Sequence, residues 1–261
     1  MPPMRTLAKG ALLIALLAAV AIPPAYAQSA SNASVAVVDV ETGEIMGANG
    51  VDSMIPANLA GRVGFTLLAH EWMDVSQTDP ASPLAGGDPD LTVGTALARL
   101  LTDGREGEMA RALMAARIGY NPSTLDSAMS ALMAEVGVDA RGVAVQRGAW
   151  GGPEWTGTVS ARDTARMGVA LARLHGDALG GPVQGGAGLQ CIAIGPAQSN
   201  TTTWVGVVSG AVSPEGCIKA AANAIELTDL RVAEGVHIAP DTVGAQTTPD
   251  MDNPIAGVAL P

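Results

Sequence analysis

The chain has 261 residues, of which 48% are hydrophobic and 15% charged, and its formal net charge is −11. Nucleic acids and anionic lipids are disfavoured as partners, because an acidic surface repels both. The length is enough for one sizeable domain, or for one domain that carries an insertion.

The first 27 residues have the features of a secretory signal peptide. Arg5 and Lys9 precede an apolar run at 11–22, and Ala25-Tyr26-Ala27 provides the small residues of a cleavage site. The run is too short to span a bilayer, which takes about 20 residues. We expect cleavage after Ala27 and a periplasmic or secreted mature chain without a membrane anchor; an uncleaved anchor is the alternative.

The mature chain, 28–261, begins with a predicted β-hairpin at 34–48. Two apolar runs flank Glu41-Thr42-Gly43-Glu44, and Gly43 can adopt the positive φ that a tight turn needs. A helix is predicted from about Asn58 to Met73. Because it is apolar over much of its circumference, we expect this helix to be buried.

Four further segments have helical patterns, and they are 91–101, 105–118, 123–137 and 158–174. Ser123 is the predicted N-cap of the third and Gly137 its stop. In the fourth, Ser160 and Asp163 have the spacing of a capping box. The glycine-rich run 176–188 has no phosphate-binding motif and is predicted to be a loop.

In the final third of the chain, the hydrophobic pattern changes from that of helices to that of strands. Strands are predicted at 189–195 and 201–211, followed by a helix that starts at Ser213-Pro214 and runs to about Leu227. The tail, 229–261, contains Pro, Thr and Asp and is predicted to be loosely held.

A helical block of roughly 58–176 therefore separates the strands of one sheet. This order predicts an α/β (α+β) fold over 28–228, in which helices flank an antiparallel sheet and a helical subdomain is inserted.

The chain has two cysteines, Cys191 and Cys217. In an exported protein an even pair is a candidate disulfide. Two separate buried thiols are the alternative, because free cysteine is among the most buried residue types.

Four segments together resemble the D-alanyl-D-alanine carboxypeptidase family of penicillin-binding proteins, whose fold is related to that of the β-lactamases. The hairpin segment "DVETGEIMGAN" is similar to the family's opening turn, and "IPANLAGRVGFTLLAHE" is similar to its Pro-Ala-Ser-x-x-Lys helix. "LTVGTALARLL" resembles the helix before its Ser-x-Asn loop. "TVSARDTARMGVALARL" resembles its Thr-Ala-Arg-Asp helix. The resemblance covers roughly 34–227 and implies a sheet-plus-helical-domain architecture.

The resemblance also implies a reaction, the acyl transfer in which a serine attacks D-Ala-D-Ala and a lysine one turn later takes its proton. A spacing of three residues puts both side chains on one helix face. This sequence has Asn58 at the serine position and Gly61 at the lysine position, and Gly104-Arg105-Glu106 at the Ser-x-Asn position. The Lys-Thr-Gly motif has no counterpart in 180–188, which contains no lysine.

A residue count supports the loss of this machinery without any alignment. The only lysine of the mature chain is Lys219, the residue three positions before it is Gly216, and Ala220-Ala221 follow it. The chain therefore contains neither Ser-x-x-Lys nor Lys-Thr-Gly.

Asn58 and Gly61 also have purely structural interpretations. Asparagine is one of the best N-cap residues, and at this position it is predicted to cap the helix, with a role in binding a ligand as the alternative. Glycine costs about 1 kcal/mol relative to alanine inside a helix. Gly61 can be explained by the close approach of another backbone, or by drift.

No metal or cofactor is predicted. His70, Glu71 and Asp74 share a helix, but no second histidine completes the H-E-x-x-H spacing, and His175 and His237 are distant in the sequence. The serine-hydrolase motif G-x-S-x-G does not occur.

The predicted function is that of a pseudoenzyme of this family, linked to peptidoglycan, which binds a stem peptide or a cell-wall protein. Arg105 and Arg111 are candidate anion ligands, although exposed surface arginines are the favoured interpretation. One alternative is a diverged hydrolase that uses Glu106 or Asp103 as its base. Another is a non-catalytic interaction module with a closed cleft. The oligomeric state is not predicted.

Overall fold

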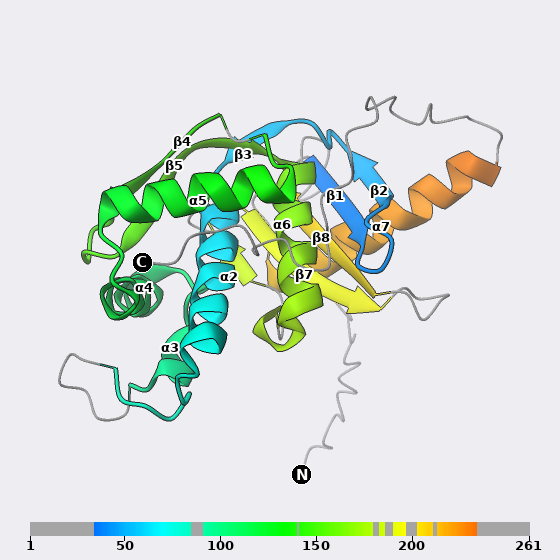
Figure 1. Cartoon of the computed structure of the whole chain (residues 1–261). Helices are drawn as coiled ribbons and strands as arrows, with labels where there is room; N and C mark the ends of the chain where they lie inside the picture. Colours follow the sequence, from blue (N-terminus) through cyan, green and yellow to red (C-terminus); the bar gives the residue numbers. More distant parts are fainter. Residues whose placement is uncertain are drawn as a thin grey trace, which may run out of the picture.

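The computed structural model describes residues 34–84, 91–139, 141–179, 183–185, 190–196, 203–210 and 213–233. Five antiparallel strands form the main sheet (Figure 1), in the order β2-β1-β8-β7-β6. Their bounds are β1 Ser34–Asp39, β2 Ile45–Asn49, β6 Val183–Gly185, β7 Gln190–Pro196 and β8 Thr203–Ser209. Strands from the two ends of the described chain thus pair in one sheet. The predicted signal peptide and 234–261 lie outside the described residues.

The opening hairpin is confirmed. Its turn is held by the Thr42 N–H, which donates to Asp39 Oδ1 at 2.6 Å, and Gly43 has a φ of 75°. A non-glycine residue would be strained there, since side chains disfavour the left-handed region.

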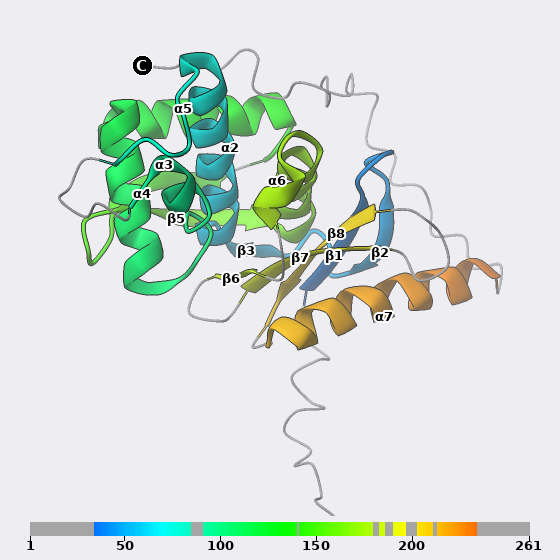
Figure 2. The same cartoon turned by 90° about the horizontal axis from the view of Figure 1, so that it is seen from below.

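Helices cover both faces of the main sheet (Figure 2). α6 (Ala161–Leu174) packs on one face and α7 (Pro214–Ala233) on the other. The Ser213 hydroxyl accepts from the Gly216 N–H at 3.1 Å, so α7 begins at Pro214 as predicted. The helix continues to Ala233, and the predicted end near Leu227 was wrong.

The disulfide is also confirmed, because Cys191 of β7 is bonded to Cys217 of α7. Both residues are buried in a small apolar cluster between the sheet and α7. The bridge therefore fastens the last helix to the sheet.

The main core lies between the main sheet, α6 and four further helices, which are α2 Asn58–Ser76, α3 Val93–Leu97, α4 Gly104–Ile118 and α5 Pro122–Val136. α2 runs through the middle of the main core, and its residues 59–69 are all buried. Burial on every side explains why its sequence is apolar over most of its circumference.

Two strands within the predicted helical block pair with one just before it to form a second sheet, which the sequence analysis missed. Its strands are β3 Met54–Pro56, β4 Arg141–Arg147 and β5 Pro153–Ser160, in the order β3-β5-β4. The β4–β5 hairpin turns through Gly148, Gly151 and Gly152, and β5 occupies residues that we had assigned to the start of a helix. α6 therefore begins at Ala161 and not at 158.

Two of the predicted helix caps are confirmed and one is shifted. Ser160 caps α6 by accepting from the Asp163 N–H at 3.0 Å, and Gly137 ends α5 with a φ of 75°. The N-cap of α5 is Asn121 and not Ser123, because Asn121 and Thr124 form a capping box around Pro122. Proline fits the first helical position, where its missing N–H would have no partner in the helix.

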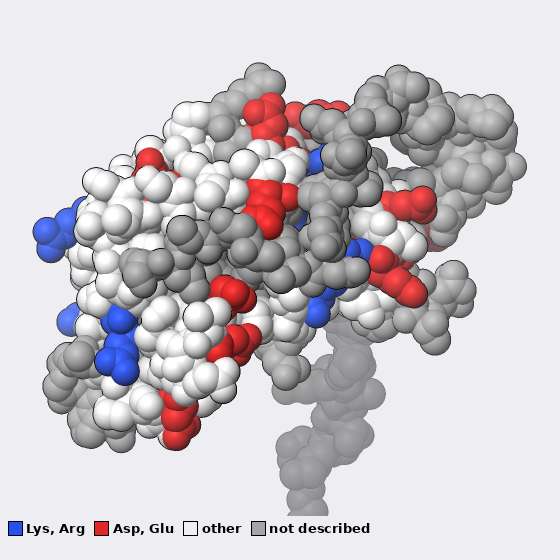
Figure 3. Space-filling view, viewed as in Figure 1, with Lys and Arg blue, Asp and Glu red and all other residues white. Residues whose placement is uncertain are grey.

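No helix among the described residues is long and apolar enough to cross a membrane. On the face shown in Figure 3, acidic side chains are spread over both the helices at the left and the main sheet at the right. Basic side chains stand mainly at the left edge, where Figure 1 places α4 and the tip of the β4–β5 hairpin, and in a strip nearer the sheet.

Candidate functional site

The first turn of α2 lies where the two sheets meet, and the backbone of β3 leads straight into it. Ala57 is the N-cap and has no side-chain capping bond, while its N–H donates to the Gly157 carbonyl at 3.1 Å. Asn58 is already helical, and its Oδ1 accepts from the Trp155 N–H at 3.5 Å. The predicted capping role of Asn58 is therefore wrong, because the strand pairing of β3 sets the entry to the helix and Asn58 turns toward β5.

Gly61 lies directly beneath the ring of Trp155. A Cβ atom at position 61 would come within 2.2 Å of Trp155 Cγ and Cδ2. Trp155 is itself buried, at 3% exposure. Glycine is required here because a tryptophan side chain, and not another backbone, makes the close approach.

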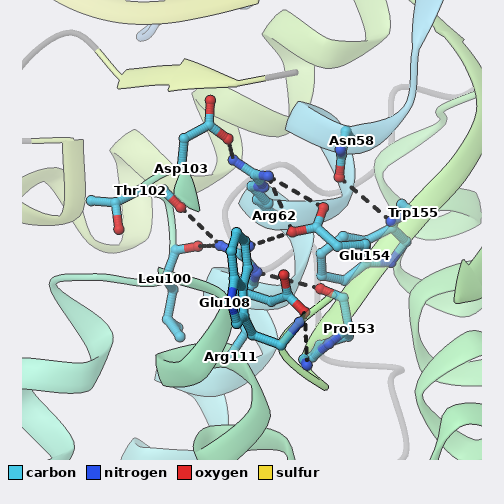
Figure 4. Close-up of polar contacts among 12 residues, drawn as sticks. Asn58, Arg62, Leu100, Thr102, Asp103, Glu108, Arg111, Pro153, Glu154 and Trp155 are labelled. Carbon is cyan, nitrogen blue, oxygen red and sulfur yellow. Dashed lines mark hydrogen bonds and ion pairs between the residues drawn. The ribbon is translucent and has the colours of Figure 1, made fainter. Parts of the chain in front are cut away.

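Arg62 follows Gly61 and reaches across the site to two acidic residues (Figure 4). Its Nη1 is paired with Asp103 Oδ1 in the α3–α4 connection. Its Nη2 lies 3.1 Å and 3.2 Å from the two carboxylate oxygens of Glu154 on β5. Arg62 is buried, so these bonds are made largely out of water, where an ion pair is stronger but costs more desolvation.

Arg111 of α4 pairs with the same carboxylate. Its Nη2 donates to Glu154 Oε1, and its remaining nitrogens donate to the carbonyls of Leu100, Thr102 and Pro153 at 2.8, 3.0 and 3.3 Å. With an exposed fraction of 0%, Arg111 is not the surface arginine that we had favoured. Burial, and secondarily Arg62, lower the pKa of Arg111, whereas Glu154 opposes the shift.

A second buried carboxylate shapes the tip of the β4–β5 hairpin. Glu108 Oε1 accepts from the Trp150 N–H at 2.6 Å and from the Gly152 N–H at 3.2 Å. A Cβ atom at Gly148 would lie 2.3 Å from the same oxygen, so the turn is wrapped closely around the carboxylate. We refer to Arg62, Asp103, Glu108, Arg111 and Glu154 as the charge network.

Solved structures of several bacterial proteins share this architecture at 13–15% sequence identity. Penicillin-binding protein 3 of Streptococcus pneumoniae, described as a peptidoglycan synthesis regulatory factor, matches with a TM-score of 0.59 over 75% of this chain and 76% of that chain, at 15% identity. Ampicillin-bound penicillin-binding protein D2 of Listeria monocytogenes matches with a TM-score of 0.54 over 75% and 96%, at 14% identity. Penicillin-binding protein 5 of Haemophilus influenzae gives a TM-score of 0.55 over 74% and 69%, at 13% identity.

The chain has the penicillin-binding-protein fold. No protein-family model and no curated protein sequence matches it. The expected fold class, a mixed α/β structure with an antiparallel sheet flanked by helices, is confirmed.

The residues that the resemblance aligned with the family's motifs are only partly brought together. Asn58 accepts from the Trp155 N–H, and Gly61 lies against the Trp155 ring. Asp103, which directly precedes Gly104-Arg105-Glu106, is paired with Arg62 on the same helix as Asn58 and Gly61. Gly104 begins α4 with a φ of 76°, while Arg105 and Glu106 are exposed on its first turn. Of the segment 180–188, only 183–185 is described, as the edge strand β6 beside α2.

His70 and His175, which are distant in the sequence, lie in contact. Their rings are stacked with centroids 4.2 Å apart and planes inclined by 20°. Burial, followed by the neighbouring His175, lowers the pKa of His70 to about 4, while Asp74 opposes the shift. Within the described ranges, no group of three His, Cys, Asp or Glu residues is arranged to hold a metal ion.

The sequence analysis missed Arg62, Glu108, Glu154 and Trp155. One signal was available, because Arg62 is the only charged residue in the apolar stretch 55–69. A lone charge in a helix predicted to be buried needs a partner, since an unpaired buried charge is strongly destabilising. The identity of that partner depends on the tertiary structure.

Proposed function

We propose that this chain is an exported, non-acylating protein of the penicillin-binding-protein fold that acts by binding in the cell envelope. The partner we propose is a peptidoglycan stem peptide or a cell-wall protein. The observation that carries the proposal is the position of Trp155, whose ring fills the space above Gly61.

Acyl transfer on this fold, as the sequence resemblance implies, needs a hydroxyl nucleophile and an amine base on one face of α2. Asn58 offers an amide, whose nitrogen is not nucleophilic because its lone pair is delocalised. A lysine at position 61 would collide with Trp155, so the base is both absent and sterically excluded. The neighbouring space is occupied by Arg62, whose charge is already balanced by Glu154 and Asp103.

Two features support export. The N-terminal 27 residues have the signal-peptide pattern, and the Cys191–Cys217 disulfide is typical of proteins that fold in an oxidising compartment. The net negative charge of the chain also disfavours a polyanion as its partner.

The first experiment asks whether a β-lactam bonds to the protein. The purified chain is incubated with a labelled penicillin, next to an active penicillin-binding protein as the positive control, and both are analysed by intact mass spectrometry. We expect no adduct on this chain, and none on the Asn58→Ser variant, because the variant still has no base. A stoichiometric adduct on the wild-type protein would falsify the proposal.

A second experiment separates binding from residual hydrolysis. Co-sedimentation with isolated cell-wall sacculi tests peptidoglycan binding, and failure to sediment leaves only protein partners. Release of D-alanine from a D-Ala-D-Ala peptide, abolished by Glu106→Gln, would instead establish a diverged hydrolase. We expect no release, since Glu106 is exposed at the first turn of α4 and is not part of the charge network.

A further inference from the structure

A pocket of about 260 Å³ lies between α4, the start of α5 and the β4–β5 hairpin. Most of its wall is apolar, with contributions from Ala112, Ala115, Pro122, Leu125, Val145 and Pro153. The volume is just below the range of about 300–1,000 Å³ that is usual for small-molecule sites. It suits one aliphatic side chain with part of its backbone.

Large apolar side chains are exposed beside this pocket. Trp150, at the tip of the hairpin that supplies one wall, is 52% exposed, although Glu108 holds its backbone firmly. Met109 is 40% exposed and precedes Ala112 by one turn of α4, so the two share a helix face. Both residues are close in the sequence to residues that line the pocket, and exposed apolar side chains near a pocket commonly mark binding sites.

The polar groups of the pocket favour an acidic segment of chain as its occupant. Arg147 is the only charged residue among those described that line it, and its side chain is exposed. Two carboxylates lie close by, and each already accepts from the backbone N–H of a lining residue, Asp126 from Val145 at 2.9 Å and Glu108 from Gly152 at 3.2 Å. The hydroxyl of Tyr120, another lining residue, is buried and has no hydrogen-bond partner among the described residues.

A segment with these properties is present in the same chain. Residues 234–261 contain four acidic residues and neither lysine nor arginine. Near the end of this region, in "PDMDNPIAGVALP" (249–261), Asp250 and Asp252 are followed by Ile255, Val258 and Leu260. Two carboxylates followed by aliphatic side chains match an arginine beside an apolar pocket.

We propose that residues 250–260 bind this pocket intramolecularly, with Asp250 or Asp252 paired to Arg147 and one of the aliphatic side chains in the cavity. The tether is long enough, because the 22 residues that follow Ala233, up to and including Ile255, span up to roughly 70 Å when extended. A domain of this size is about 45 Å across. Tethering also makes the binding intramolecular, so individually weak contacts are sufficient.

Photo-crosslinking in the full chain tests the inference. Benzoylphenylalanine replaces Gln146, an exposed lining residue, and mass spectrometry locates the crosslinked peptide. We expect crosslinks to 249–261 at a yield that is independent of protein concentration. The matched control places the same probe at Val75, which is 64% exposed at the far end of α2 and should not reach the segment.

Charge reversal sharpens the test. Arg147→Glu should lower the yield from position 146 roughly two- to fivefold, as expected for one exposed ion pair. Adding Asp250→Lys and Asp252→Lys to that variant should restore it, whereas Arg105→Glu should leave the yield unchanged.

Three results would overturn the proposal. The first is equal yields from positions 146 and 75, and the second is an absence of crosslinks to 249–261. The third is a yield that rises with protein concentration, which would mean that the segment binds a second copy. Far-UV circular dichroism of each variant shows whether a loss reflects misfolding. The proposal does not depend on the function proposed above, because it concerns a different surface.

Discussion

Glu154 is the residue on which the site depends. Its carboxylate is shared by Arg62 and Arg111, so it connects both α2 and α4 to β5. Removal of one partner from a buried ion pair leaves the other charge uncompensated, which is far more costly than the pair is stabilising.

We therefore predict that Glu154→Gln lowers the free energy of unfolding by about 2–4 kcal/mol, because the buried guanidinium of Arg111 loses its carboxylate partner and that of Arg62 keeps only Asp103. Urea unfolding followed by circular dichroism measures the change. The matched control is Glu106→Gln, an exposed glutamate for which we expect a change within about 0.5 kcal/mol. Equal midpoints for the two variants would show that the charge network does not stabilise the fold.

At the level of single residues, the absence of a catalytic motif was easier to predict than the tertiary contacts of a given side chain. That the chain lacks Ser-x-x-Lys is a property of the sequence and needed no structure. The burial of Arg111 was not foreseen, since its partner Glu154 lies 43 positions away and no local pattern connects the two. Trp155 and Gly61 are separated even further, so the reason for the glycine was equally hidden.

At the level of elements, two titratable side chains meet where α2 contacts the end of α6. His70 and His175 stack there, with Asp74 and Glu71 as the acidic neighbours. Burial of the two rings disfavours their protonation, and this lowers both pKa values.

This arrangement predicts a pH dependence of stability. The pKa of His70 is about 4 in the folded chain and near 6.5 in the unfolded one, so the unfolded state binds more protons between these values. The contribution is fully present above pH 6.5 and is lost as the pH falls toward 4, with a slope of at most roughly 1.4 kcal/mol per pH unit for each proton.

Urea unfolding of the wild-type chain and of His70→Phe between pH 4 and pH 7.5 measures this effect. Carboxylates titrate in both proteins, so the difference between the two curves isolates the histidine. We expect a shallower loss in the variant, and parallel curves would contradict the prediction.

Helices were predicted better than short strands. The periodicity of α2 and α5 extends over four or more turns, whereas β4 and β5 are seven and eight residues long and interrupted by glycine. Val143 and Val145 are β-branched, stand two positions apart and precede the glycine-rich turn Gly148–Gly152, a signal that the surrounding helical patterns obscured.

At the level of the whole molecule, the disulfide joins the sheet to the last described helix. Cys191 and Cys217 are 26 residues apart, and closing a loop of that size restricts the unfolded chain. The stabilisation expected from this restriction is about 3 kcal/mol.

The double variant Cys191→Ala/Cys217→Ala should accordingly be less stable than the wild-type chain by about 3 kcal/mol in denaturant unfolding. Wild-type protein under reducing conditions provides the comparison, and its unfolding midpoint should move toward that of the double variant. Equal free energies of unfolding for the oxidised wild type and the double variant would show that the disulfide does not stabilise the fold.

Local pattern alone was enough to predict the opening hairpin, the buried helix, the change from helices to strands in the final third, and the absence of Ser-x-x-Lys. Each of these depends on periodicity, turn chemistry or residue counts over a short stretch of chain. Packing decided the rest, including Trp155 above Gly61, the sharing of Glu154 by two arginines, and the stacking of His70 on His175. Such contacts join residues 43 to 105 positions apart, and their geometry exists only when helices and sheets have been brought together by burial of the common core.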